Sequence, residues 1–285
     1  MLKRTISGAF FVAVIAGFIC LKEFVDSRLF SILVWFCSSI GTMEVARALK
    51  DKIGKKSLIL SVVYAVLFIP SYAVVEFFIG KGLGIYACLI LAVLTVFINT
   101  IFCFVEKVGV KELLVKAFVV IYPSFLFLAM LVVSNLVGAK SLIGLLLIFA
   151  ISPLTDTLAY LVGMVYNKIR KGKAKKLCPR LSPKKTWAGA IGGTIGGVLG
   201  GILVFVIFKA KCLTLGLPLP LLIFAIIGFV GAILTQVGDL FESGIKRKVG
   251  IKDMGKIMPG HGGILDRFDG MLFVSVLISI VFLFI

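Results

Sequence analysis

The chain has 285 residues, of which 60% are hydrophobic, and a formal net charge of +18 at pH 7. Long apolar runs recur along it, whereas the buried helices of a soluble domain are interrupted by polar faces. A helix needs about 20 apolar residues to cross the hydrocarbon layer of a membrane. The composition therefore excludes a soluble globular protein and predicts an all-α, polytopic integral membrane protein.

Hydropathy predicts nine membrane-spanning helices. They are expected at residues 5–21, 27–46, 57–79, 83–105, 115–137, 141–163, 187–208, 219–238 and 270–285. The first resembles a signal peptide, but no small-residue cleavage site follows it, so we expect it to be retained. We expect one integral membrane unit, in which residues 1–140 are helices without recognisable chemistry and residues 141–285 are the catalytic region.

The basic residues are distributed unequally between alternate connections. With nine spans, 25 of the 31 Lys and Arg residues fall on one side of the membrane and 6 on the other. The positive-inside rule then predicts a multi-pass protein of the cell inner membrane, with a cytoplasmic N-terminus and cytoplasmic basic loops. Such loops attract anionic lipid headgroups, so the charge predicts a lipid bilayer as partner and no nucleic acid.

The first half of the chain offers few candidates for chemistry. Its cysteines, like the others, are scattered without a CxxC pair, which is typical of packing residues. Glu44 and Glu76 lie near the ends of expected spans, where a carboxylate can reach water. We expect both to anchor their helices at the membrane interface.

The sixth expected span contains a carboxylate. Ser152-Pro153 is expected to interrupt the helix, because proline removes a backbone donor. Asp156 follows inside the apolar run, and Tyr160 and Gly163 come after it. A carboxylate within the membrane costs free energy, so it indicates a functional site by default. The alternative is that Asp156 is paired with another group and has a structural role.

A basic loop leads into a glycine-rich span. The loop ends with the sequence Ser-Pro-Lys-Lys-Thr-Trp at residues 182–187, and paired glycines then recur from Gly189 to Gly201. No Gly-Lys-Ser/Thr follows, so the glycines do not form a P-loop. Their spacing predicts close helix packing, within the chain or between the subunits of a homodimer.

The eighth span is expected to extend beyond the membrane. Its helical pattern continues from Leu221 to Lys248, about 42 Å at 1.5 Å per residue, against a hydrocarbon layer of about 30 Å. The extension carries Asp239, Glu242, Ser243 and Lys246 on one face. Carboxylates and a cation on one face fit a metal–phosphate site, and also an ordinary solvated face.

A glycine bend and two acids precede the last span. Gly260, Gly262 and Gly263 permit conformations in which successive N–H groups converge on an anion. Asp266 and Asp269 follow where the last helix begins, a place that favours an anion or an acidic side chain. With Asp239 they could hold Mg²⁺ through hard oxygen ligands.

His261 is the single histidine of the chain, which excludes a His-rich zinc site. A histidine in this bend either hydrogen-bonds a phosphate or caps the turn.

Residues 238–269 resemble the signature of the phosphatidate cytidylyltransferase (CDP-diacylglycerol synthase) family. The signature positions are Ser243, Lys246, Arg247, Lys252, Asp253, Gly255, Pro259, Gly260, His261, Gly262, Gly263, Asp266, Arg267 and Asp269, preceded by Gly238-Asp239-Leu240. Asp156-x2-Ala159-Tyr160-x2-Gly163 and residues 182–187 are similar to two further family segments, all in the C-terminal half. One departure is Ala188, where the family leads us to expect a glutamate after the tryptophan.

The resemblance implies transfer of CMP from CTP to phosphatidate, giving CDP-diacylglycerol and pyrophosphate in phospholipid biosynthesis. Dependence on Mg²⁺ is implied, with Asp239, Asp266 and Asp269 as ligands of one or two cations. Lys246 and Arg267 are the further expected catalytic residues. The expected substrate-binding residues are Asp156, Tyr160, Ser182, Lys184, Lys185, Thr186, Ser243, Arg247, Lys252, His261, Gly262 and Gly263.

Two other classes of protein compete with this interpretation. A transporter or channel predicts paired broken helices in two related halves, but only Asp156 fits and no internal repeat is visible. An enzyme that consumes CDP-lipids, such as a CDP-alcohol phosphotransferase, has an Asp-x2-Asp-Gly-x2-Ala-Arg pattern. Only its opening resembles Asp266-x2-Asp269-Gly270 of this chain.

Overall fold

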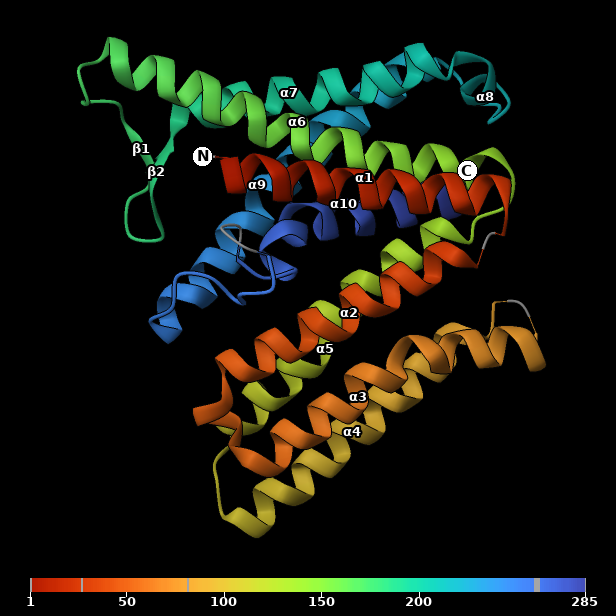
Figure 1. Ribbon diagram of the computed structural model, residues 1–285, viewed down its shortest axis with the longest axis vertical. Coiled ribbons are helices and arrows are strands. Elements are labelled where there is room, and N and C mark those ends of the chain that lie inside the picture. The colour runs from red at the N-terminus through yellow and green to blue at the C-terminus, as the bar shows by residue number, and fades with distance from the viewer. Residues whose placement is uncertain (1, 27, 81, 259–261, 285) are drawn as a thin grey trace. The chain divides into compact units, whose positions relative to one another are not determined.

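The computed structural model describes residues 2–26, 28–80, 82–258 and 262–284, with the backbone alone for residues 2–7. In this described part the chain forms ten helices and one two-stranded sheet. Eight of the helices are long and apolar enough to span a membrane. The prediction of an all-α polytopic membrane protein is thereby confirmed (Figure 1).

The chain divides into two compact units. The first contains Met1–Leu131 and Ile251–Asp266, and the second contains Val132–Gly250 and Arg267–Ile285. The structure groups the segment Ile251–Asp266 with the N-terminal helices. The division of the chain into an N-terminal region and a catalytic region near residue 140 stays a prediction.

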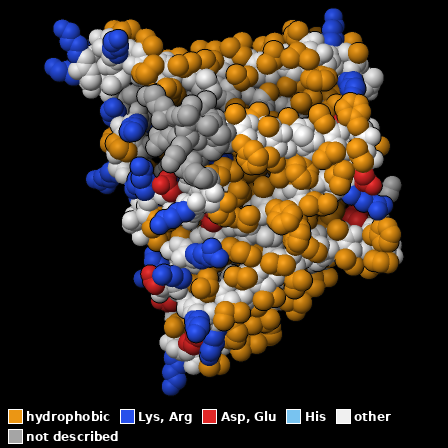
Figure 2. Space-filling view, in the orientation of Figure 1, with side chains coloured by type: hydrophobic (Ala, Val, Ile, Leu, Met, Phe, Trp, Pro, Cys, Tyr) orange, Lys and Arg blue, Asp and Glu red, His pale blue; other side chains and the backbone are white. Residues whose placement is uncertain are grey.

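The helices of the first unit follow the first five expected spans. They are α1 (Leu2–Phe24), α2 (Leu29–Ala48), α3 (Lys50–Phe78), α4 (Gly84–Glu106) and α5 (Val110–Ser134), whose last turn belongs to the second unit. α3 begins earlier than expected, because a polar stretch with a kink at Gly54 (φ 76°) precedes its apolar part. The exposed lysines of this stretch gather near the start of α3, while hydrophobic side chains cover the neighbouring surface of α3 and α4 (Figure 2).

Glu76 joins α3 to α4. Its Oε1 accepts hydrogen bonds from the backbone N–H groups of Gly82, at 2.8 Å, and Gly84, at 3.0 Å. The carboxylate thus satisfies donors that a helix start leaves without intrahelical partners. Glu76 lies at the end of its helix, as expected, and its contacts give it a capping role there.

The second unit is built on three long helices and a hairpin. Its elements are α6 (Ala139–Ile169), β1 (Lys176–Cys178), β2 (Ser182–Thr186), α7 (Trp187–Ile207), α8 (Lys209–Leu213), α9 (Pro220–Val249) and all but the start of α10 (Leu265–Phe284). The 30-residue α9 confirms the predicted extension. The expected interruption at Pro153 is wrong, because α6 continues through it.

The antiparallel hairpin β1–β2 was not predicted. It lies within the basic loop, and Lys176 pairs with Thr186 while Cys178 pairs with Ser182. Lysine-rich segments have low strand propensity, so the loop carries no strand signal. The hairpin leads directly into α7, whose first turn is capped by Thr186 as its Oγ1 accepts from the N–H of Gly189 at 3.0 Å.

The glycines of α7 pack against two helices of the same unit. A Cβ at Gly193 would lie 3.0 Å from the Cβ of Ala159 on α6. On the other side, a Cβ at Gly201 would overlap the carbonyl oxygen of Phe224 on α9. The prediction of close helix packing is confirmed, with α6 and α9 as partners, which lie beside α7 in Figure 1. These glycines let α6 and α9 pack closely against α7 along most of its length.

Candidate active site

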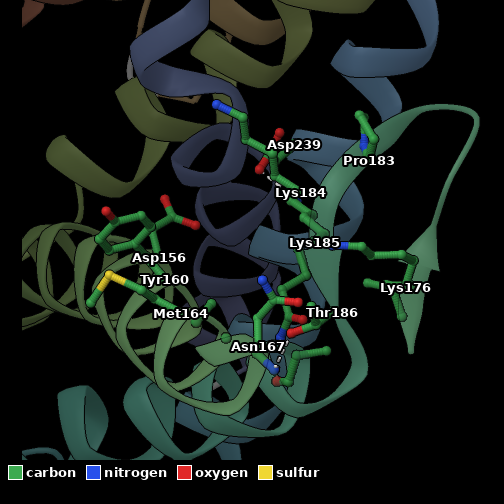
Figure 3. A pocket seen from close by; sticks show the side chains of 16 residues that line it. Asp156, Tyr160, Met164, Asn167, Lys176, Pro183, Lys184, Lys185, Thr186 and Asp239 are labelled. Carbon is green, nitrogen blue, oxygen red and sulfur yellow. Dashed lines mark hydrogen bonds and ion pairs between the residues drawn. The ribbon is translucent and has the colours of Figure 1, made fainter. Parts of the chain in front are cut away.

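A cavity of about 400 Å³ opens in the second unit among α6, the hairpin, the start of α7 and α9. This volume lies within the range of small-molecule sites, about 300–1,000 Å³. Six of the predicted site residues line it, as Figure 3 shows: Asp156, Tyr160, Lys184, Lys185, Thr186 and Asp239. The structure therefore brings together residues that are far apart in the sequence, such as Asp156 and Asp239.

One face of α6 forms a wall of the cavity. Asp156, Tyr160, Gly163 and Asn167 line it at i, i+4, i+7 and i+11, a spacing that places residues on the same side of a helix. Gly163 lets the helix approach the start of α7, because a Cβ there would lie 3.1 Å from Thr186 Oγ1. A carboxylate and a phenol thus face a site whose opposite wall is basic.

The opposite wall is held by an ion pair between β2 and α9. Lys185 Nζ lies 2.5 Å from Asp239 Oδ2, with side chains that are 25% and 30% exposed. Asp239 Oδ1 also accepts a hydrogen bond from Ser243 Oγ at 3.3 Å, one helical turn further along α9. Since these groups remain partly open to the cavity, they are able to meet a ligand there.

Asp269 of α10 belongs to the same charged group. At Gly238 of α9, a Cβ would lie 2.6 Å from the carbonyl oxygen of Asp269, so the two helices approach closely beside Asp239. Asp269 interacts electrostatically with Asp156, Asp239 and Glu242. Lys185 and Arg267 offset the negative charge near Asp156. Four carboxylates and two cations therefore share one region of the second unit.

The end of α9 contributes two more predicted residues. Lys246 forms an ion pair with the fully buried Glu242, at 3.2 Å, and also interacts electrostatically with Asp269. Arg247 is exposed, and its Nε donates to the carbonyl oxygen of Leu181, at 3.4 Å. Arg247 thus ties α9 to the turn of the hairpin that carries Lys185.

The two hydrogen bonds described for Asp266 are formed within the first unit. Its Oδ2 accepts hydrogen bonds from the backbone N–H groups of Met254, at 2.8 Å, and Gly263, at 2.7 Å. Gly262 has a φ of +86°, which favours glycine, and a Cβ there would lie 2.6 Å from the same oxygen. The N–H of Gly263, which was expected to converge on an anion, is thus already bound to an acidic side chain of the chain itself.

The remaining predicted residues have other positions. Lys252 is exposed in the first unit, and Ser182 pairs with Cys178 within the hairpin. Arg267 is half-buried, and its Nε has no hydrogen-bond partner among the described residues. The expectations for His261, Pro259 and Gly260 fall on residues outside the described part of the chain.

Three polar lining residues were not predicted from the sequence. Asn167 lies on the same helical face as Asp156, and Lys176 pairs with Thr186 across the hairpin. Gln236 precedes Asp239 by three residues and donates to the carbonyl oxygen of Ala190 at 3.3 Å. Helical periodicity would have identified Asn167 and Gln236, whereas Lys176 had no signal without the hairpin.

The donor chemistry of this region fits Mg²⁺, because Asp156, Asp239 and Asp269 offer the hard carboxylate oxygens that this ion prefers. Within the described residues, no group of three His, Cys, Asp or Glu side chains is arranged to hold a metal ion. The assignment of Asp239, Asp266 and Asp269 as metal ligands therefore stays a prediction.

Comparison with known proteins places this site in context. A family model described as "Cytidylyltransferase family" matches residues 2–285. The chain is 32% identical, over 254 residues, to the phosphatidate cytidylyltransferase of Bacillus subtilis (strain 168), an alignment that covers 86% of this chain and 85% of that protein.

Two staphylococcal proteins match a shorter part of the chain at higher identity. The chain is 42% identical over 136 residues to the phosphatidate cytidylyltransferase of Staphylococcus saprophyticus, covering 48% of this chain and 47% of that protein. It is 44% identical over 135 residues to that of Staphylococcus aureus (strain COL), covering 46% of each.

Proposed function

The chain belongs to the cytidylyltransferase family, and from that premise we propose that it transfers CMP from CTP to phosphatidate, releasing pyrophosphate. It is a nucleotidyltransferase embedded in a membrane. The structural observation that carries the proposal is the cavity in which Lys185 and Asp239 form an ion pair opposite Asp156. Cations that bind phosphate oxygens and carboxylates that bind a metal ion are both needed for this reaction.

The proposed reaction forms one phosphorus–oxygen bond and breaks another. A phosphate oxygen of phosphatidate attacks the α-phosphorus of CTP, and the bond to the β-phosphate breaks as pyrophosphate leaves. Such a transfer depends on positioning and charge neutralisation more than on a protein nucleophile. Lys185, Lys246 and Arg267 are the cations proposed to bind the phosphate oxygens, and the partly exposed Lys185 lies nearest to the cavity.

The family resemblance also implies Mg²⁺, and we propose Asp239 and Asp269 as its ligands in the second unit. The role of Asp266, which lies in the first unit, stays a prediction. When bound, the ion would neutralise charge on the phosphate oxygens. The chain's own part is to hold the carboxylates in place. Gly238 does so by bringing α9 against α10, and Ser243 does so by donating to Asp239.

The activity is tested by incubating the purified protein in detergent with phosphatidate, Mg²⁺ and CTP labelled at the α-phosphate. We expect label to enter a lipid that is extracted into organic solvent, and none when phosphatidate is omitted or the divalent cation is chelated. Label that stays water-soluble in the complete mixture would refute the proposal and would leave a transporter or another class of enzyme.

The proposed location is the cell inner membrane, with the N-terminus, the hairpin loop and the end of α9 on the cytoplasmic side. It rests on the bias of Lys and Arg toward these segments. Two variants of a cysteine-free protein, Lys173→Cys and Val137→Cys, place an exposed thiol on opposite sides. In right-side-out vesicles a membrane-impermeant thiol reagent should label the second variant and not the first. Labelling of Lys173→Cys alone would reverse the topology.

A homodimer stays a prediction. The glycine face that suggested it does not support it, because the glycines of α7 pack against α6 and α9 of the same chain.

A further inference from the structure

α2 supplies a buried carboxylate to the start of α10 within the first unit. Glu44 is 3% exposed, and its two oxygens accept hydrogen bonds from two consecutive backbone N–H groups. Oε1 accepts from Ile264 at 3.1 Å, and Oε2 accepts from Leu265 at 3.0 Å. A negative charge is favourable at this end of a helix, where backbone donors have no intrahelical partners. This burial and pairing differ from the interfacial anchoring expected of Glu44.

The bonds of Glu44 continue those of Asp266. The N–H of Gly263 donates to Asp266, and the next two N–H groups along the chain donate to Glu44. Asp266 also accepts from the N–H of Met254, on the other side of the bend. Two carboxylates, one of them more than 200 residues away in the sequence, thus hold three consecutive donors of the segment that carries the family signature.

Two glycines enclose the Glu44 carboxylate. A Cβ at Gly255 or at Gly263 would overlap its oxygens, and the same Cβ at Gly255 would lie 2.9 Å from the Cα of Gly263. The bend therefore closes around Glu44 from both sides, and no larger residue fits at either position. A side chain that is merely an interfacial anchor does not need such an enclosure.

We propose that Glu44 is a positioning residue for cytidylyl transfer. It fixes Ile264 and Leu265, and through them the orientation of the adjacent Asp266, while making no contact with substrate. The inference deepens the proposed function and rests on it. The alternative is that Glu44 contributes to stability alone, in which case its loss would lower the melting temperature without a specific effect on turnover.

Glu44→Gln separates these alternatives, because it preserves the shape of the side chain and removes one acceptor. The amide oxygen can accept from one of the two N–H groups, and the amide NH₂ then faces the other donor. One backbone donor is left buried without a partner, and the start of α10 is released. Glu44→Asp retains the charge and both acceptors on a shorter side chain, so it is expected to recover part of what Glu44→Gln loses.

The matched control is Glu76→Gln. Glu76 also accepts two backbone hydrogen bonds at a helix start, those of Gly82 and Gly84, but it lies at the α3–α4 connection and outside the signature. Glu76→Gln therefore measures the general effect of losing a capping carboxylate. Glu44→Gln measures the effect of losing the carboxylate at the start of α10.

The experiment measures kcat, the KM for CTP, the melting temperature and the hydrogen exchange of residues 253–266 for each full-length variant in detergent. For Glu44→Gln we expect kcat to fall about 100-fold, since a small misplacement of reacting groups has an effect of this size. KM should change little, exchange at Ile264 and Leu265 should increase, and the melting temperature should fall, because a buried donor loses its partner. The control should keep the kcat of the wild type.

Wild-type kcat in Glu44→Gln, or a loss of kcat equal to that of the control, would overturn the proposal. So would unchanged exchange at Ile264 and Leu265. A wild-type protein that forms no lipid product would refute the proposed function, and the positioning role with it. The exchange data would still show in that case whether Glu44 holds the bend, so the two failures are distinguishable.

Discussion

Replacement of Asp239 by Asn is expected to lower turnover by about 100- to 1,000-fold, the usual effect of removing one charged or hydrogen-bonding group from a reacting centre. Asn has the same shape and can still accept from Ser243, so the fold of α9 should be kept. The change removes the negative charge that faces the cavity and breaks the ion pair with Lys185. The measurement is the rate of lipid labelling from CTP, together with the melting temperature in detergent.

Asp51→Asn is the control for this experiment. Asp51 is an exposed carboxylate in the first turn of α3, in the first unit, and its replacement changes the net charge by the same amount. We expect wild-type turnover from it. If the turnover of Asp239→Asn lies within about three-fold of the control, the loss is much smaller than that expected for a group at the reacting centre. Such a result would show that Asp239 is not part of the active site.

The second large effect is expected for Gly201→Val in α7. A Cβ at this position would overlap the carbonyl oxygen of Phe224 and lie 3.3 Å from the Cα of Gly228, both on α9. A backbone group within a helix cannot move aside as a side chain can, so α7 and α9 would separate. Overpacking of this kind costs about 3 kcal/mol, and we expect a lower melting temperature and a larger aggregated fraction after detergent extraction.

Gly17→Val provides the matched control for overpacking. Gly17 also lies in a long apolar helix, α1, but it is exposed, and no described heavy atom lies within 4 Å of a Cβ placed there. This variant should keep the wild-type melting temperature. An equally stable Gly201→Val protein would show that the close approach of α7 and α9 is not needed for the fold.

The helical framework could be predicted from the sequence because its signals are local. The apolar pattern from Leu221 to Lys248 predicted the extension that α9 shows from Pro220 to Val249. The glycine spacing in α7 predicted close packing, and the partners are α6 and α9. Both predictions rest on periodicities that repeat every three to four residues, which a single sequence displays directly.

The hairpin was beyond this kind of prediction. Its strands contain Lys176, Lys184 and Lys185, which do not favour strands, and they are held by pairing with each other and by Arg247 of α9. Asp156, Asp239 and Lys185 were predicted as site residues, but their arrangement around one cavity follows from tertiary structure. The sequence therefore predicted several residues of the cavity, but not how they are arranged around it.

The role of Glu44 depends on partners more than 200 residues away, Ile264 and Leu265. No local pattern connects them, so the sequence of α2 alone predicted an interfacial anchor. The one available signal was the cost of a carboxylate within an apolar segment, the same argument that drew attention to Asp156. Applied to Glu44, it would have indicated a buried partner.

The most direct test of the account compares CTP labelled at the α-phosphate with CTP labelled at the γ-phosphate, each incubated with phosphatidate, Mg²⁺ and the purified protein. A cytidylyltransferase should place the α-label in the lipid fraction and the γ-label in pyrophosphate, in equal amounts and with phosphatidate as the required acceptor. Appearance of the γ-label in lipid, or release of pyrophosphate without a labelled lipid, would contradict the proposed function.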